Sequence, residues 1–486
     1  MIGVSQISVS AYRGGGGGVP VNPDFVIEVD TTRAGSASDT IILPLLPGGT
    51  YDGTIDWGDS SSDDLTYANR QHTYASGGTY TIIISGDTFE GWKYNGSGDR
   101  RKILDISNWG FLNITTDNAF HGCLNLDISA TDSPTISTNS FYRIFFNCTN
   151  LTTPDFSGWD VSSVTNMQAA FRNCPSFNGD VSTWDVSSVT NFGQISYGAP
   201  EGMFAGCGSF NIDITNWNTA SATKMTAMFS ACTSFNQDIS GWDVSSVSEM
   251  KNMFSGCSSF NQPIHNWTPT SLTQIAQMFN GATIFNQPIN SWAISPITSG
   301  NDSGLFRTFK NAQAFNQDLN SWNVSGVTNM EEAFAYATSF NGDITLWDVS
   351  NVTSFGKSAY GASFGMFLGA SSFNQDIGNW DTSSGTDFHS MLAGTTSFDQ
   401  SLAGFDLTSA TRVNINPPNL STANYDATLI GWESILDAAY PGGVGYPYTP
   451  ACNFGSTKYT SGGAAEAART SLITNFGWTI TDGGAA

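Results

Sequence analysis

Apolar and polar residues repeat with a long, fixed period through the middle of the chain. Nine tryptophans follow one another at steps of 25, 33, 25, 25, 25, 30, 25 and 33 residues: Trp159, Trp184, Trp217, Trp242, Trp267, Trp292, Trp322, Trp347 and Trp380. Phenylalanines recur twelve and eighteen residues after the tryptophan, as Phe254 and Phe260 do after Trp242. No offset carries the 3.6-residue period of a long helix. Because a unit of this size cannot bury its own apolar face, the pattern predicts stacked coils in which each apolar offset forms a ladder.

The repeat extends beyond the tryptophans in both directions. Phe405 stands 25 residues after Trp380 in place of a tryptophan, and the pattern FxxCxxL at Phe120 recurs at Phe145. We therefore assign the array to residues 103–420, in about twelve coils of about 4.8 Å each, which gives a rod of roughly 55 Å. A long, rigid and repetitive surface suits recognition better than a single chemical step.

Two of the longer steps contain insertions that match each other. Residues 191–203 read NFGQISYGAPEGM and residues 354–366 read SFGKSAYGASFGM, and a third insertion precedes Phe309. Insertions in a repeat map to loops on one face, often the binding face, although neutral drift in length is an equal alternative. Tyr197 and Tyr360 are the candidate ligand contacts, because tyrosine offers a flat contact area with few rotatable bonds. The same tyrosines would alternatively pack the loops down.

The ends of the chain follow other patterns. Residues 24–102 contain short alternating segments, such as Phe25, Ile27 and Val29, between Gly- and Asp-rich turns, which predicts a small β-sandwich. Residues 421–486 contain two helical segments and a strand, and because the last apolar coil must be covered, they are expected to form an α+β cap. The expected fold class is mainly β with short helices.

Two polar ladders accompany the apolar ones. An asparagine follows the second phenylalanine in most coils, as Asn236 and Asn261 do, and a buried asparagine can satisfy turn backbone groups in neighbouring coils. An aspartate comes two residues later in six coils, where stacked carboxylates must be solvated or bridged by cations. Calcium would supply such a bridge. Pro263 and Pro288 interrupt the series, which favours solvated surface over a calcium site.

Six of the seven cysteines occupy one repeat offset, and Cys232 and Cys257 are two of them. Later coils place alanine at this offset, so the position requires a small buried apolar group. Alanine cannot replace a zinc ligand or a disulfide partner. The pattern predicts a row of reduced, buried thiols.

Composition narrows the function classes. A formal charge of -24 with only 17 basic residues argues against nucleic acid as a partner. No apolar run reaches the 18 residues that would predict insertion into a membrane. There is no GxSxG, phosphate loop or HExxH motif, so we predict no catalytic residues and no enzyme activity. A pair of aspartates acting as in a glycosidase stays an open alternative.

Residues 1–23 begin with scattered apolar residues and continue into a flexible joint of five glycines, Gly14–Gly18. They lack the charged start and continuous apolar run of a signal peptide. We expect residues 1–20 to be a docking peptide that attaches the protein to another protein.

Three segments carry a family resemblance. The repeat FNQDISGWDVSSVSEMKNMFSGC resembles the BspA-type leucine-rich-repeat surface proteins, whose repeats read FNQDISxWDVSxVTxMxxMF. The words TIDWGDSS and HTYASGGTYTI resemble the PKD-type Ig-like domain, and LSTANYDATLIGW resembles the closing segment of BspA-type proteins. The resemblance implies a right-handed leucine-rich-repeat-type solenoid with short strands. It also implies a role in adhesion and surface recognition without catalysis.

Three functions are compatible with these observations. The first is a bacteriophage virion appendage that binds a host-surface glycan or protein, docks onto other virion proteins through residues 1–20, and is exposed at the virion surface. A virion protein reaches the outside by lysis and needs no export signal. The second is a bacterial cell-surface adhesin, and the third is a polysaccharide-degrading solenoid enzyme. The sequence leaves homo-oligomerisation open.

Overall fold

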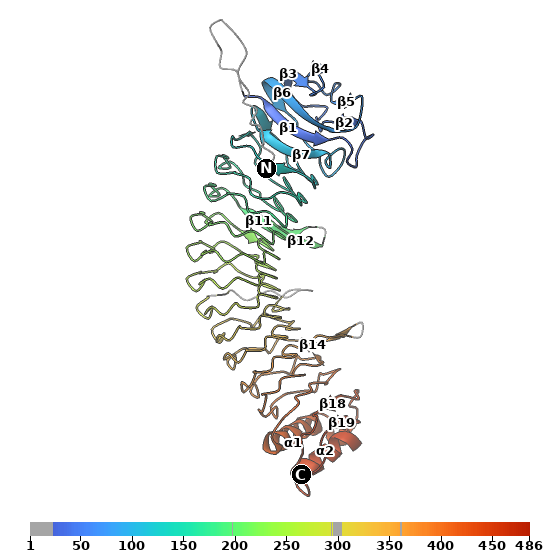
Figure 1. Ribbon diagram of the computed structural model, residues 1–486. Helices are drawn as coiled ribbons and strands as arrows, with labels where there is room; N and C mark the ends of the chain where they lie inside the picture. The colour runs from blue at the N-terminus through green and yellow to red at the C-terminus, as the bar shows by residue number, and fades with distance from the viewer. Residues whose placement is uncertain (1–22, 197, 293, 295–303, 360–361) are drawn as a thin grey trace, which may run out of the picture.

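The computed structural model describes residues 23–486 except 197, 293, 295–303 and 360–361. The molecule is a rod, with a β-sheet region at one end, stacked coils along its length and helices at the other end (Figure 1). Within the described part, the helices are α1 (Thr422–Ala439), α2 (Ala464–Thr474) and the 3-10 turn η1 (Pro441–Gly443). The prediction of a mainly β chain is confirmed. Residues 1–22, which include the expected docking peptide, lie outside the described residues.

An eight-stranded sheet forms the N-terminal end and continues into the first coils. Its strands are β1 (Phe25–Asp30), β3 (Tyr51–Asp56), β4 (Ser62–Asp64), β6 (Thr79–Glu90), β7 (Ile103–Asn108), β8 (Leu112–Ile114), β9 (Asp127–Ile128) and β10 (Thr135–Ile136). The order β10-β8-β6-β1-β7-β9 runs across the boundary that the sequence suggests at residue 102. β1 pairs antiparallel with β7, and β7 pairs parallel with β9. The sheet therefore joins the N-terminal region to the coils without a flexible linker.

A second small sheet pairs β2 (Thr40–Ile42) with β5 (Gln71–Thr73). Strand β5 includes His72, the first residue of the segment HTYASGGTYTI. Trp57 is fully buried, and the ring of His72 stacks on it with 4.9 Å between ring centroids. Asp59 accepts hydrogen bonds from Ser61 and lies 2.9 Å from Nε2 of His72. These bonds, that from Ser61 first, lower the pKa of Asp59 to about 2. Asp59 thus shapes its own turn.

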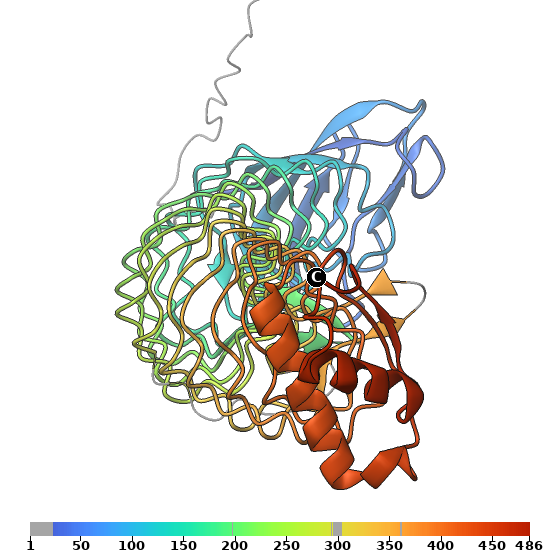
Figure 2. The ribbon, with the colours of Figure 1, turned by 90° about the horizontal axis from the view of Figure 1, so that it is seen from below.

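The coils are joined by backbone hydrogen bonds between residues about one repeat apart. The N–H of Phe229 donates to the carbonyl of Met253 at 3.0 Å, and Phe254 repeats this bond with Met278 at 2.9 Å. Regular pairing appears as short strands, namely β11 (Asn191–Ser196), β12 (Ala199–Gly202), β13 (Lys224–Met225), β14 (Ser354–Gly356), β15 (Ser358–Ala359), β16 (Ala362–Ser363) and β17 (Asp387–Phe388). Seen along the rod, successive coils superimpose around a shared interior (Figure 2).

Aromatic rings fill this interior. Phe254 and Phe260 are fully buried and stack with 4.2 Å between their centroids, and Phe254 also stacks on Phe229 at 5.9 Å. Trp242 is 3% exposed, and its indole N–H donates to the carbonyl of Ile214 in the preceding coil at 3.2 Å. Each coil therefore caps a backbone group of its neighbour while it buries a ring.

Asparagine links the coils in the same way. The side-chain oxygen of Asn211 accepts from the backbone N–H of Asn236, and Asn236 accepts from that of Asn261, both at 2.9 Å. Most aspartates two residues after the asparagine bond within their own turns. Asp238, for example, accepts from the N–H of Ser240 at 2.9 Å, whereas Asp318 accepts from the backbone N–H of Asp343 in the next coil at 2.8 Å. Both polar ladders thus stabilise turns.

Six of the cysteines share one offset of the coils, Cys452 lies in the C-terminal region, and all seven are buried free thiols. The sulfur of Cys232 donates to the carbonyl of Phe204 at 3.1 Å, and that of Cys257 donates to Phe229 at 2.8 Å. Burial raises the pKa of both thiols well above their ordinary value.

The C-terminal region lies across the end of the last coil (Figure 2). Helix α1 begins after Ser421, whose hydroxyl accepts from the N–H of Asn424, and it buries Tyr425 and Trp432. Helix α2 packs beside α1, and β18 (Ala451–Asn453) pairs parallel with β19 (Thr479–Thr481). Asp482 accepts from Tyr425 and Arg469, both at 2.7 Å, and so ties the helices to the terminal strand.

Candidate functional site

In each coil, one segment precedes the core phenylalanine and ends one residue after it. These segments lie together on one side of the array. Bridges connect Ser140, Asn166 and Asn191, then Lys224, Glu249 and Gln274, and later Asn329, Ser354, Asp387 and Arg412. We call this side, from residue 140 to residue 412, the strand face. Hairpin β11–β12 and hairpin β15–β16, which form the two matching insertions, both project from it (Figure 1).

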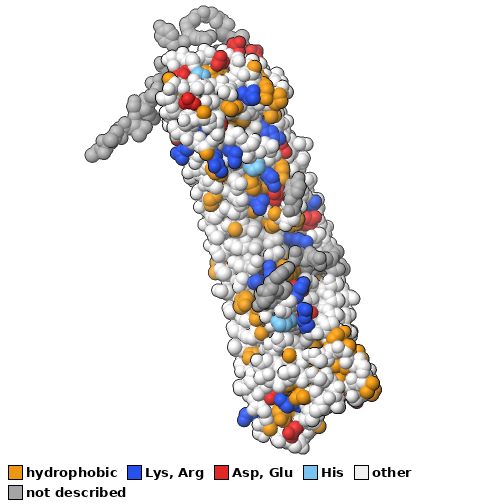
Figure 3. Space-filling model, turned by 90° about the vertical axis from the view of Figure 1, so that its right-hand side faces the viewer, with side chains coloured by type: hydrophobic (Ala, Val, Ile, Leu, Met, Phe, Trp, Pro, Cys, Tyr) orange, Lys and Arg blue, Asp and Glu red, His pale blue; other side chains and the backbone are white. Residues whose placement is uncertain are grey.

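The strand face collects the charged residues that do not repeat. Residues 103–420 contain eight Lys or Arg and four Glu, all in this segment of their coils: Arg143, Arg172, Lys224, Lys251, Arg307, Lys310, Lys357, Arg412, Glu201, Glu249, Glu331 and Glu332. Lys and Arg side chains follow one another along this face (Figure 3). Most aspartates of the array instead bond within turns at repeated offsets, as Asp160 and Asp238 do. The rod therefore separates its cations from most of its carboxylates.

The first insertion carries the centre of a charged cluster. Glu201, in β12, is 2% exposed and pairs with the guanidinium groups of Arg143 and Arg172. It also accepts from the amide of Gln168 at 2.8 Å and the hydroxyl of Tyr142 at 3.2 Å. Two cations thus share one carboxylate, which we call the Glu201 cluster. The buried carboxylate holds hairpin β11–β12 to the two preceding coils.

Aromatic rings fix the cations of this cluster. Arg143 lies over the rings of Tyr142 and Phe146, at 4.9 and 5.1 Å from their centroids, and Arg172 lies 5.4 Å from that of Phe146. The edge of Phe146 meets the ring of His121 at 4.8 Å. Burial and the neighbouring arginines lower the pKa of His121 to about 4. His121 is therefore neutral near pH 7.

A second cluster lies near the other insertion. Glu332 is 2% exposed and pairs with Arg307 and Lys310, each at 2.5 Å. Arg307 lies over the rings of Phe306 and Phe364, at 4.6 and 5.6 Å. Phe364 follows β16, so the insertion again contacts a pair of cations around one buried carboxylate. We call this the Glu332 cluster.

Left-handed backbone recurs at two offsets of the repeat. Arg143, Arg307 and Glu332 have φ of 54°, and Ala227 and Asn252 have positive φ at the same offset, two residues before the core phenylalanine. Tyr336 has φ of 59° at the second offset, which glycine or asparagine occupies in several other coils. The left-handed conformation therefore belongs to the fold of the coil and does not distinguish the clusters. Tyr336 is 43% exposed.

The predicted contacts Tyr197 and Tyr360 both lie outside the described residues. The neighbours of Tyr197 line a groove of about 470 Å³ between β11 and the preceding coils. Tyr142 and Gln168 of the Glu201 cluster form one wall, and Gln194, Ile195 and Ser196 form the other. The structure therefore joins the first insertion to arginines and amides that the sequence analysis did not select. The sequence alone could have indicated these residues, because every Lys and Arg of the array falls in one segment of the repeat.

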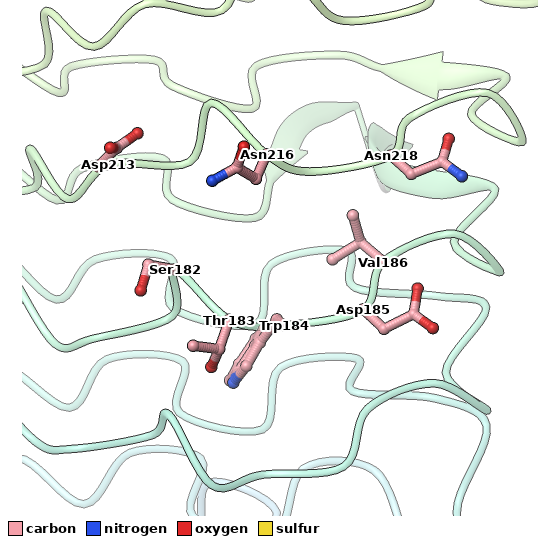
Figure 4. Close-up of a pocket in the computed structure, with 8 residues that line it drawn as sticks. All are labelled: Ser182, Thr183, Trp184, Asp185, Val186, Asp213, Asn216 and Asn218. Atoms are coloured by element: carbon pink, nitrogen blue, oxygen red, sulfur yellow. The ribbon is translucent and has the colours of Figure 1, made fainter.

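A second groove, of about 580 Å³, separates the coil of Trp184 from the next coil (Figure 4). Asp185, Asp213 and Asn218 line it, but each accepts a hydrogen bond from the backbone two residues later. These polar groups are thus used by their own turns. Across the described residues, no group of three or more His, Cys, Asp or Glu side chains is placed to hold a metal ion.

The remaining positions of the array are structural. Trp242, Phe254, Phe260, Cys232 and Cys257 lie in the core. Asn236 and Asn261 bond to one another across adjacent coils. None of the helices in the part of the chain that the structure describes is long and apolar enough to cross a membrane.

Comparison with known proteins gives one family and no individual relative. Three consecutive segments, residues 96–201, 199–303 and 304–428, match the family described as Mycoplasma protein of unknown function, DUF285. A search of curated proteins found no significant match. The matched segments together cover more than half of the 486 residues and the whole length of the strand face. The chain therefore belongs to the DUF285 family of repeat proteins.

Proposed function

We propose that this protein is a non-enzymatic recognition protein that presents the strand face to a partner. One observation carries the proposal: charged and aromatic residues on the strand face differ from coil to coil, whereas the other offsets repeat. Packing explains the repeated residues, since every coil needs the same ring, thiol and amide in the same place. Packing does not require Lys251 in one coil and Lys357 in another, since neither lysine forms an ion pair with a described residue. A partner that binds this face would account for both.

The proposed architecture follows the resemblance of the motifs. The coils form a right-handed leucine-rich-repeat-type solenoid of the BspA kind, and an N-terminal PKD-type β-sandwich and a C-terminal cap close its two ends. The continuous sheet from β1 to β9 supports a rigid junction at the N-terminal end. A rigid junction holds the strand face at a fixed angle to the N-terminal sheet.

The proposed carrier is a bacteriophage virion, with residues 1–20 docked on other virion proteins and the coils directed outward to a host-surface glycan or protein. The alternative carrier is a bacterial cell, where the protein would act as an adhesin. The buried glutamates speak against a hydrolase. Glu201 and Glu332 are each only 2% exposed and each paired with two cations, so neither carboxylate is presented to a substrate as a catalytic acid.

Binding to intact bacterial cells tests the recognition function. Fluorescently labelled protein is mixed with a panel of cells, and bound protein is measured by flow cytometry. We expect saturable binding to some cells, unchanged when residues 1–20 are deleted and reduced by the double substitution Tyr197→Ser and Tyr360→Ser. Release of reducing ends from the cell polysaccharide would contradict the non-enzymatic function, and absence of binding to every cell would contradict recognition.

A further inference from the structure

We propose that the strand face between hairpins β11–β12 and β15–β16 binds a linear acidic polysaccharide along the rod axis. The proposal rests on the recognition function above and names its ligand class. Five carboxylates lie among the eight cations of the described strand face, those of Glu201, Glu249, Glu331, Glu332 and Asp387, so this face has a formal charge of +3. The chain as a whole has a charge of -24. A positive face on so acidic a protein attracts an anion and orients it on approach.

The two clusters supply fixed positive charge. Glu201 and Glu332 each neutralise one of two cations, which leaves one positive charge in each cluster. The side chains of Arg143, Arg172, Arg307 and Lys310 are 20–29% exposed, so their outer edges reach solvent. The buried carboxylates and aromatic rings already hold these groups in place. A ligand that binds them therefore avoids much of the entropy cost of ordering long side chains.

The lysines between and beyond the clusters form fewer interactions within the protein than the cluster cations do. The amino group of Lys224 lies 3.1 Å from the amide oxygen of Gln194 and 3.9 Å from Glu249. Lys251 and Lys357 form no ion pair with any described residue, and Lys357 is exposed. These three side chains are available to an anion without breaking a buried interaction.

The spacing favours a polymer over a small ion. Backbone bonds connect residues 202, 227, 252, 277, 307, 332 and 365 in successive coils, so six coil steps separate the two hairpins. At about 4.8 Å per step, the interval is roughly 29 Å. A single phosphate or carboxylate would engage one cluster only. A chain with a negative charge on successive units would engage the clusters and the lysines together.

The neutral residues of this face favour sugars over nucleic acid. Gln274, Gln277 and Asn280 lie between the two clusters and offer amides to hydroxyl groups. Tyr336, one residue beyond the strand-face segment of its coil, is 43% exposed, and a tyrosine ring suits stacking on a sugar ring.

Calorimetry with polygalacturonate tests the proposal. The variant carries Lys224→Gln, Lys251→Gln and Lys357→Gln. The matched control, with the same change in charge away from the strand face, carries Arg33→Gln, Arg70→Gln and Lys458→Gln. Thermal unfolding of both variants checks that they fold. We expect wild-type protein to bind polygalacturonate at low salt but not neutral dextran. The variant should bind about tenfold more weakly or worse, the control within about twofold of wild type.

Three results would overturn the inference: equal affinity of variant and control, equal binding of dextran, or tighter binding of a single-stranded oligonucleotide than of polygalacturonate. Cell binding separates this inference from the recognition function. If the lysine variant binds cells as wild type does, recognition stands and the strand-face assignment fails. If wild type binds polygalacturonate but no cell, the ligand class stands and cell recognition fails.

Discussion

The indole N–H of Trp432, in helix α1, donates a hydrogen bond to the backbone carbonyl of Leu402 at 2.8 Å. Trp242 makes the same bond to Ile214 within the coils. Leu402 lies three residues before Phe405, as Ile214 lies three before Trp217, so Trp432 takes the place of the tryptophan of a further coil. Asn424 of the same helix bonds to Asp399, where the asparagine ladder ends. Helix α1 thus continues two ladders with helical residues at the end of the stack.

Trp432→Phe should destabilise the C-terminal end. Phenylalanine keeps most of the apolar contact but removes one of the two hydrogen bonds that the buried Leu402 carbonyl accepts, the other coming from the N–H of Phe405 at 3.0 Å. This loss should cost about 0.5–1.5 kcal/mol beyond the loss of ring size. Trp109→Phe is the matched control, since Trp109 is fully buried but its indole nitrogen has no hydrogen-bond partner among the described residues. Chemical unfolding should show the larger loss for Trp432→Phe. Equal losses would show that the bond to Leu402 contributes nothing.

Phe254→Ala should lower the free energy of unfolding by about 3–5 kcal/mol, because it opens a cavity between stacked rings of three coils. Phe229, Phe260 and Phe279 all lie within 6 Å of its ring centroid. Leu346→Ala is the control, because Leu346 is 77% exposed. Urea denaturation followed by tryptophan fluorescence measures both. A smaller loss of unfolding free energy for Phe254→Ala than for Leu346→Ala would show that the aromatic stack does not contribute to stability.

The sequence alone was sufficient to predict that the repeated residues stack on one another in the core. Phe254 and Trp242 recur at a fixed offset, and an offset repeated in every coil can only stack on itself. The Glu201 cluster was not predictable in this way. Arg143 and Glu201 are separated by 58 residues and by an insertion, so their pairing depends on how the hairpin folds back. The pairing of β1 with β7 likewise joins residues about 80 apart, which no local pattern encodes.

The seven thiols should be unreactive in the folded protein and all free after unfolding. Burial raises the pKa of Cys452 to about 12, and it raises the pKa of Cys174 and Cys207 well above the ordinary value. Thiolate is the reactive form, so alkylation at pH 8 should modify none of them under native conditions. Mass spectrometry after denaturation without reductant should find seven modified cysteines. Recovery of linked peptides containing Cys207 and Cys232 would refute the prediction.

His121 should make the protein sensitive to mild acid. Its pKa is about 4 in the folded state, below its ordinary value of 6.5, owing to burial and then to Arg143 and Arg100, with Glu201 opposing. As pH falls from 6.5 to 4, the unfolded chain binds a proton that the folded chain excludes, so stability declines over this window. Because the ring is only half buried, we expect His121→Gln to remove about 1 kcal/mol of the decline between pH 7 and 5. His265 is exposed, so His265→Gln should leave the decline in stability unchanged. Urea titrations at pH 7 and pH 5 measure the decline for both variants.

Glu201→Gln should be the most damaging single change on the strand face. Glutamine keeps the shape of the side chain but removes the charge that Arg143 and Arg172 share at a position only 2% exposed. Breaking a buried pair in this way typically costs about 3–5 kcal/mol, because the remaining charges lose their partner. Glu249→Gln is the matched control, since its contact with Lys224 is 3.9 Å long and partly exposed, and its loss should cost less than about 1 kcal/mol. Urea denaturation compares the two, and limited proteolysis reports whether hairpin β11–β12 detaches first. If Glu201→Gln is no worse than Glu249→Gln and the hairpin stays protected, the cluster does not anchor the first insertion.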